Sequence, residues 1–185
     1  MLAKILLTAV GAYFLLKKSD LAQKAELDFS GFNLFMNFVN ESISGINDKY
    51  DSLFVKYGQR YGVDPKIVKA ISANESQVGN IMGTMTVNGR TTGGLMHIEL
   101  PTAQDYEPNI TAKELLIPDN EIRIGTMHIR KLLDRYNGNI ELVTRAYNGG
   151  MGRVQEFLNG SVSSTWERNT TEYYNRYKRN FERLG

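Results

Sequence analysis

The chain opens with an apolar run from Leu2 to Leu16, which Lys4 and Thr8 interrupt and Lys17-Lys18 closes. A helix of this length reaches about 22 Å, short of the roughly 30 Å hydrocarbon core of a bilayer. Lysine snorkelling would lengthen that reach, so a cleaved signal peptide, a retained membrane anchor and a buried helix all stay open. Residues 1–18 are therefore predicted as a hydrophobic anchor or signal segment.

Residues 19–48 are predicted as a connector that carries an amphipathic helix. Apolar residues recur there at spacings of three and four, at Phe29, Phe32, Met36, Val39 and Ile43. Such a stripe either packs on the following domain or forms a surface for a membrane interface or a partner. A compact domain is expected over residues 49–185.

The strongest helix signal in that domain is Asp64-Pro65, an N-cap followed by proline at the first helical position. Val68 and Ile71 turn an apolar face towards the core. Glu75 follows one turn after Ile71, near the end of the same helix. The pattern thus places a single carboxylate at the end of an apolar helix.

Residues 79–94, rich in Gly, Thr and Asn, interrupt the helical pattern. The Asn88-Gly89 pair between β-formers predicts a small β-hairpin. Helices are expected to restart at Pro101 and Pro118, to stop at Asn137-Gly138, and to resume over residues 140–147 and 170–184. The predicted fold class is mainly α with a minor β element.

Composition narrows the possible functions. The formal net charge of +2 is too small to indicate nucleic-acid binding, and the 42% hydrophobic content suffices for a core. The sequence has no cysteine, which excludes disulfides and thiol chemistry. His97 and His128 lack metal-ligand spacing, and no zinc or nucleotide motif is present. We therefore predict no cofactor, no metal and no nucleic-acid partner.

Three segments carry the candidate chemistry, namely Glu75-Ser76, Gly94-Leu95-Met96-His97-Ile98 and Ala146-Tyr147-Asn148-Gly149-Gly150. They supply a carboxyl group, a glycine turn that runs into apolar residues, and a second turn with an aromatic hydroxyl and an amide. Glycoside cleavage needs a carboxylic acid in an apolar surround as proton donor. Taken alone, Glu75 is typical of an exposed helix end, but the combination indicates glycan cleavage.

In this order the three segments resemble the soluble-type (SLT, goose-lysozyme-like) lytic transglycosylases, roughly from Tyr50 to Tyr177. The resemblance implies a mainly α, α+β lysozyme-like fold and makes Glu75 the sole catalytic acid/base. The glycine turn would let backbone approach the glycan while Met96 lines the cleft. The substrate-binding set that the resemblance implies is Ser76, Thr92, Gly94, Leu95, Met96, His97, Tyr147, Asn148 and Tyr173.

The tyrosines of this set have different expected roles. Tyr147 matches the family's Ala-Tyr-Asn block, whose tyrosine lies near the catalytic glutamate. Tyr173 falls where the family often has a tyrosine near the end of the domain, and core packing is its favoured role, with substrate binding as the alternative. Ser76 completes the family's Glu-Ser pair, as a hydroxyl that supports the turn.

The sequence departs from the family pattern at several positions. His97 stands where glutamine is usual, so it either hydrogen-bonds the glycan or is structural, and it adds a titratable site. The loop 87–92 lacks the serine that the family often has there. Either Thr91 or Thr92 makes the substrate contact of that serine, or the contact is absent. Gly149 stands where alanine is usual, which is expected to loosen the turn.

The resemblance also implies the reaction. One glutamate would protonate the oxygen between N-acetylmuramic acid and N-acetylglucosamine, then take the proton of the muramyl C6 hydroxyl as it closes onto C1. Glu99 and Asp105 are candidates for a second carboxylate, which would make the protein a hydrolytic muramidase instead. A non-catalytic peptidoglycan-binding protein is the remaining alternative.

The expected partners are peptidoglycan glycan strands, a membrane reached through the N-terminal segment, and secretion-complex or virion proteins. The expected location is correspondingly the bacterial periplasm or cell envelope, membrane-anchored or exported, or a phage virion.

Overall fold

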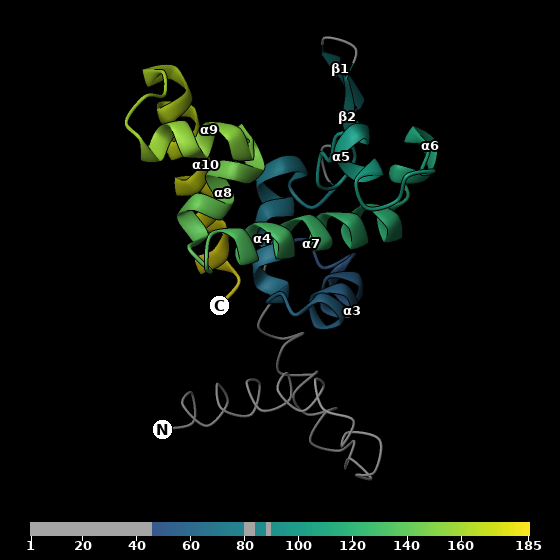
Figure 1. The fold of residues 1–185 in the computed structure, drawn as a ribbon. Helices are drawn as coiled ribbons and strands as arrows, with labels where there is room; N and C mark the ends of the chain where they lie inside the picture. The colour runs from purple at the N-terminus through teal and green to yellow at the C-terminus, as the bar shows by residue number, and fades with distance from the viewer. Residues whose placement is uncertain (1–45, 80–83, 88–89) are drawn as a thin grey trace, which may run out of the picture. The chain divides into compact units, whose positions relative to one another are not determined.

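The computed structural model describes residues 46–79, 84–87 and 90–185, and side chains are described outside residues 80–92. Within these ranges the chain is mainly helical, as Figure 1 shows, and the predicted fold class is confirmed. The hydrophobic segment 1–18 and the amphipathic stripe of residues 29–43 lie outside the described residues. The domain boundary at residue 49 stays a prediction.

Two helices begin the described domain, α3 (Asp51–Tyr61) and α4 (Pro65–Ser76). Gly62 ends α3 in a left-handed conformation at φ 67°, which glycine adopts without steric cost. Asp64 then caps α4, because its side chain accepts a 2.8 Å hydrogen bond from the Lys66 amide. The predicted start of α4 is therefore confirmed.

A buried ion pair joins these two helices. Lys69 of α4 has no exposed side-chain surface, and its Nζ lies 2.6 Å from Oδ1 of Asp51 in α3. Burial raises the pKa of Asp51, against the hydrogen bond to Lys69, which lowers it. The pair is a specific link between α3 and α4 because a buried charge is costly without its partner.

Strands β1 (Thr84–Val87) and β2 (Arg90–Gly93) pair antiparallel, with Val87 opposite Arg90 and Thr84 opposite Gly93. Two short helices follow, α5 (Leu100–Gln104) and α6 (Ala112–Leu115). A capping box between Thr111 and Glu114 fixes the start of α6.

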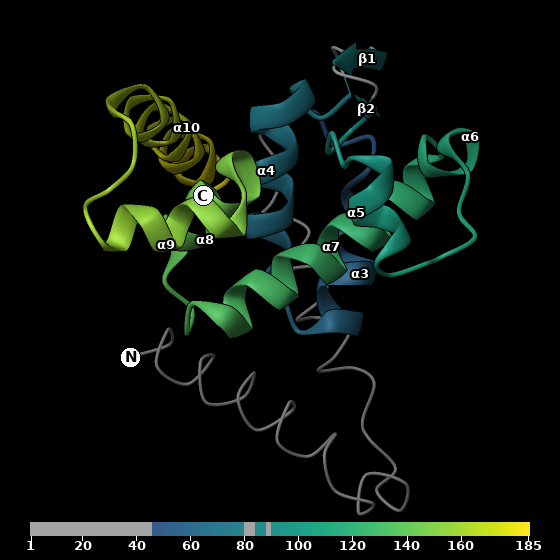
Figure 2. The same ribbon diagram turned by 45° about the horizontal axis from the view of Figure 1, so that its top comes forward.

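Helix α7 (Pro118–Arg135) is central to the described domain and packs on α3, α4, α6 and α8. Figure 2 shows α4 and α7 between two groups of elements, with the hairpin, α5 and α6 on one side and α8, α9 and α10 on the other. One face of α7 is buried, and its residues include Ile122, Gly125, Ile129, Leu132 and Leu133.

Helices α8 (Ile140–Gly149), α9 (Met151–Leu158) and α10 (Ser164–Arg183) complete the chain. Helix α10 packs against both α4 and α8. It begins at Ser164, earlier than the predicted residue 170. The reason is that the Ser163 side chain accepts a 3.3 Å bond from the Trp166 amide and caps the helix.

Candidate active site

Glu75 is the next-to-last residue of α4, and 14% of its side chain is exposed. The helix stops just beyond it because Gln77 and Val78 both adopt left-handed conformations, at φ 53° and 55°. That conformation is unfavourable for a residue with a Cβ, and more so for β-branched Val78. Buried Val78 is held there nonetheless, so the carboxylate sits at an abrupt helix end.

Both oxygens of the Glu75 carboxyl have a protein partner. The hydroxyl of Tyr173, from α10, donates a 2.6 Å hydrogen bond to Oε1. Nδ1 of His97, from the turn before α5, lies 3.3 Å from Oε2. Burial raises the pKa of Tyr173 well above its usual range, so its hydroxyl stays protonated and donates. The structure thus brings together three residues that the sequence analysis singled out.

The turn that carries His97 begins at Gly94, whose φ of 77° is left-handed. A Cβ at Gly94 would overlap the carboxylate of Glu121, so only glycine fits. Oε2 of Glu121 accepts a 2.6 Å bond from the Leu95 amide, and Oε1 accepts a 2.9 Å bond from the Met96 amide. Glu121 therefore fixes the backbone of the turn against α7.

Glu121 is fully buried, and the sequence analysis did not identify it. Burial raises its pKa to about 7, although the hydrogen bonds from the backbone amides of the turn act in the opposite direction. A signal was nonetheless present in the sequence. Glu121 lies one turn before Gly125 on the apolar stripe of α7, and a carboxylate on a core-facing stripe requires a buried partner.

Hydroxyl groups from two other helices hold the carbonyls of the same turn. Ser72 and Ser76 of α4 donate to the Leu95 carbonyl at 3.0 and 2.8 Å. Tyr147 of α8 donates to the Met96 carbonyl at 2.8 Å. The turn is thereby hydrogen-bonded to side chains of three helices, α4, α7 and α8.

Some residues of the predicted substrate-binding set lie inside the protein. Ser76 is 1% exposed, while Leu95 and Met96 are fully buried. Met96 packs on α7, where its Sδ lies 2.5 Å from the point that a Cβ on Gly125 would occupy. These side chains therefore lie beneath the turn and support it, and they do not line a surface open to a glycan.

Tyr147 and Tyr173 both lie near Glu75, but their hydroxyls bond to different groups. Tyr147, predicted near Glu75, uses its hydroxyl on the turn and its ring on His128, at 5.6 Å between ring centres. Tyr173, for which core packing is the favoured prediction, is 1% exposed and also makes a direct contact with Glu75. Asn148 is exposed on α8.

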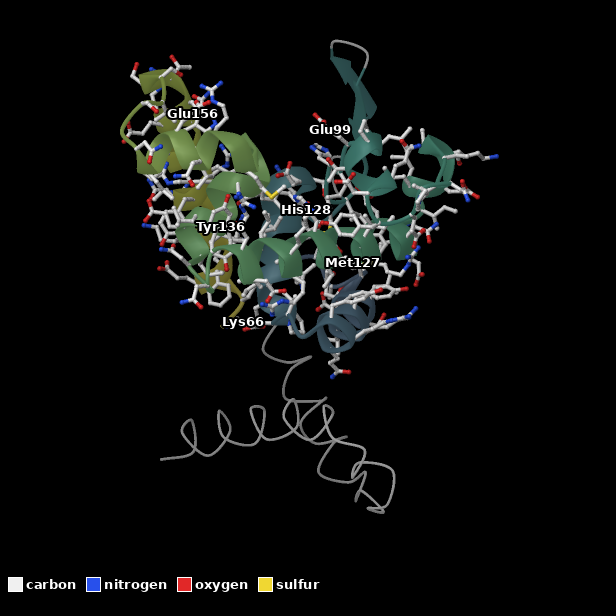
Figure 3. The ribbon with its side chains drawn as sticks, in the orientation of Figure 1. Lys66, Glu99, Met127, His128, Tyr136 and Glu156 are labelled. Atoms are coloured by element: carbon white, nitrogen blue, oxygen red, sulfur yellow. The ribbon has the colours of Figure 1, made fainter. Side chains whose placement is uncertain are left out.

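His128, the second histidine, belongs to the packing behind the turn. Its Nδ1 lies 3.0 Å from the hydroxyl of Tyr106, and burial lowers its pKa to about 4, so the ring is neutral at physiological pH. Figure 3 shows His128 among the side chains around the middle of α7.

Gly149 has a structural role that the sequence analysis did not anticipate. The indole Nε1 of Trp166 donates a 3.0 Å bond to the Gly149 carbonyl, and a Cβ on Gly149 would lie 2.5 Å from that nitrogen. The missing Cβ makes room for Trp166, and so it tightens the contact between α8 and α10 instead of loosening the turn.

The remaining candidates lie around the start of α5. Thr92 is in β2, and its side chain is outside the described ones. Glu99 precedes the first residue of α5 and is half-buried, and Figure 3 labels it there. Asp105 has a 65% exposed side chain with Nζ of Lys131 at 4.0 Å. Over the described ranges, no group of three His, Cys, Asp or Glu residues could hold a metal ion.

Comparison with known proteins gives a family. The transglycosylase SLT domain matches residues 52–167. The chain is 28% identical over 129 residues to a membrane-bound lytic murein transglycosylase F of Photobacterium profundum, covering 64% of this chain and 23% of that protein. A putative soluble lytic murein transglycosylase of Haemophilus influenzae is 31% identical over 114 residues, 59% of this chain and 18% of that protein.

The fold also has a solved counterpart. The crystal structure of the 70 kDa soluble lytic transglycosylase of Escherichia coli superimposes with a TM-score of 0.59 at 23% identity, over 75% of this chain and 24% of that one. The chain spans less than a quarter of the length of these relatives.

Proposed function

Because the chain belongs to the transglycosylase SLT family, we propose that it is a lytic transglycosylase that cleaves peptidoglycan. The proposed bond is the β-1,4 linkage from N-acetylmuramic acid to N-acetylglucosamine. The observation that carries the proposal is the environment of Glu75, a mostly buried carboxyl at a helix end whose two oxygens are oriented by Tyr173 and His97. The names of the matched relatives support the same substrate class.

In the first step, Glu75 donates its proton to the glycosidic oxygen as the bond from that oxygen to C1 of the muramyl residue breaks. General acid catalysis of this kind contributes roughly 10²–10⁴-fold to a rate. The leaving N-acetylglucosamine keeps the proton as its hydroxyl, and Glu75 is left as a carboxylate. The Tyr173 hydroxyl, which donates to Oε1, stabilises the charge that forms there.

In the second step, the Glu75 carboxylate takes the proton of the muramyl C6 hydroxyl while that oxygen bonds to C1. The product is a 1,6-anhydro sugar, and Glu75 is protonated again. No second carboxylate is needed, because the C6 hydroxyl belongs to the same sugar and is already positioned. Glu121 also contacts the turn, but both of its carboxyl oxygens accept hydrogen bonds from the backbone amides of Leu95 and Met96. It therefore has no role in this step.

The proposed setting is the bacterial cell envelope. The matched relatives carry both membrane-bound and soluble in their names, which supports an envelope enzyme. No helix within the described part of the chain is long and apolar enough to cross a bilayer. Association through residues 1–18, and binding to secretion-complex or virion proteins, stay predictions.

Mass spectrometry of the material released from purified sacculi by the full chain tests the proposed function. Muropeptides that end in 1,6-anhydro-N-acetylmuramic acid are the expected products. Reducing ends in their place would identify a hydrolytic muramidase. Binding to sacculi without release, by a protein that is folded by circular dichroism, would identify a non-catalytic peptidoglycan-binding protein.

A further inference from the structure

Two features place the His97 ring beside Glu75: the contact between the two side chains and the backbone conformation of His97. It adopts a left-handed conformation at φ 49°, which costs free energy for a residue with a Cβ. The two preceding residues, Leu95 and Met96, keep the turn in this conformation through their backbone hydrogen bonds. Their partners are the side chains of Glu121, Ser72, Ser76 and Tyr147. The imidazole is therefore positioned beside the carboxyl before any substrate binds.

The pair is accessible as well as close. The side chain of His97 is 27% exposed and that of Glu75 is 14% exposed, so both reach the surface from which a glycan would approach. At 3.3 Å from Oε2, Nδ1 of His97 is within hydrogen-bonding reach of the atom that would deliver the proton.

The groups around the pair come from four elements besides the turn itself. Glu75 is on α4, Glu121 on α7, Tyr147 on α8 and Tyr173 on α10. Burial raises the pKa of both tyrosines well above their usual range, so they stay neutral. The hydrogen bond to Glu75 is the largest cause that raises the pKa of His97, burial opposes it, and the charges of Glu75 and Glu121 reinforce it.

We propose that Glu75 and His97 hold one exchangeable proton in common and act as a single proton donor and acceptor. This rests on the proposed function, which it deepens. With the proton on Nδ1, the pair is a carboxylate beside an imidazolium. With the proton on Oε2, it is a carboxylic acid beside a neutral ring, which is the form that protonates the glycosidic oxygen.

The proton balance follows directly. Oε2 gives its proton to the leaving oxygen, which leaves a carboxylate and a neutral imidazole. The proton of the muramyl C6 hydroxyl then returns to Oε2 as the new C–O bond forms, and it is shared again with Nδ1. The pair loses its last proton only when pH rises through the raised pKa of His97. A glutamine in this position keeps a hydrogen-bond donor but cannot hold the proton.

An NMR titration of the histidine ring signals tests whether Glu75 and His97 share a proton, and it does not require an activity assay. The sequence contains two histidines, so the ring signals of the full chain are assigned by comparison with His97→Gln. In the wild type, His97 is expected to titrate above its ordinary pKa. In Glu75→Gln its midpoint should fall, because the hydrogen bond to the Glu75 carboxylate is the largest cause of the raised pKa. His128, which is half-buried on α7 with its Nδ1 3.0 Å from the Tyr106 hydroxyl, serves as an internal reference that should not move.

The second arm measures the release of muropeptides from sacculi as a function of pH. The alkaline limb of the wild-type profile should lie at higher pH than that of His97→Gln, with similar rates on the acidic side. His97→Asn, whose short side chain tolerates the left-handed backbone, should show the same displacement if His97→Gln is poorly folded. Glu121→Gln controls for the other group that titrates near neutral pH.

Superimposable pH profiles of the wild type and both His97 variants would overturn the proposal. So would a His97 midpoint that Glu75→Gln leaves unchanged, or an alkaline limb that moves in Glu121→Gln and not in His97→Gln. A wild type that releases nothing at any pH would overturn the proposed function instead, and the NMR titration would still decide whether the pair shares a proton.

Discussion

The hydroxyl of Tyr173 donates a 2.6 Å hydrogen bond to Oε1 of Glu75, although the two lie 98 positions apart in the chain. The contact exists because α10 packs along α4 and turns Tyr173 inwards, where 1% of it is exposed. Helix α10 thereby contributes a side chain to the site around Glu75 of α4.

Replacing Glu75 by glutamine removes the proton while keeping the size of the side chain. We expect the release of soluble muropeptides from sacculi to fall by roughly 10²–10⁴-fold, because the general acid is lost. Asp105→Asn is the matched control, since exposed Asp105 pairs with Lys131 and should leave release unchanged. Equal losses in both variants would mean that Asp105 also serves the reaction.

Tyr173→Phe tests the hydroxyl that orients the carboxyl. A hydrogen bond to a charged group is worth about 1.5–3 kcal/mol, so the rate of release should fall on the order of 10–100-fold. The neighbouring half-buried Tyr174 provides the control, and Tyr174→Phe should retain the wild-type rate. If Tyr173→Phe melts well below the wild type and yet keeps its activity, the hydroxyl serves packing alone.

Glu121 makes stability depend on pH. Its folded pKa of about 7 lies above the unfolded value of 4.5, so the folded state binds the extra proton between these limits. The resulting stabilisation, roughly 3 kcal/mol, is complete below pH 4.5 and is lost as pH rises through about 7. Urea unfolding at pH 5 and pH 8 should therefore show the wild type more stable at pH 5.

Glu121→Gln should flatten that dependence while lowering stability overall. Its amide oxygen can accept from one of the two backbone amides, and its NH₂ group would face the other, which costs about 1–3 kcal/mol. His97 titrates in the same direction, because its folded pKa is also raised, so some dependence should remain. An unchanged pH dependence in Glu121→Gln would locate its origin elsewhere.

Gly149→Ala should destabilise the fold even though alanine favours helices. Its Cβ would lie 2.5 Å from Nε1 of Trp166, which must shift and weaken its bond to the Gly149 carbonyl. Overpacking of this kind costs about 1–3 kcal/mol. Gly152→Ala is the matched control in α9, where a Cβ meets nothing within 4 Å, and it should be neutral or slightly stabilising. Thermal melting of the two variants decides the point.

Local signals in the sequence determined the mainly helical fold and much of its segmentation. Asp64-Pro65 starts α4 as predicted, and Pro118 starts α7, because caps and prolines act through residues next to them in the chain. The predicted start of α10 at residue 170 was wrong, because Ser163 was not recognised as its cap. The order of Glu75, the glycine turn and Tyr147 was likewise enough to indicate the family.

Only the tertiary structure decided which groups meet. Glu121 reaches the turn from a different helix, and Ser76 turns inwards to the Leu95 carbonyl. Tyr173 donates to Glu75, while Tyr147 donates to the Met96 carbonyl. Each of these contacts depends on how helices pack across long separations in sequence, which the spacing of residues within one element does not determine. Burial then sets the charge states, because removal of water raises the pKa of Glu121 and keeps the tyrosines neutral.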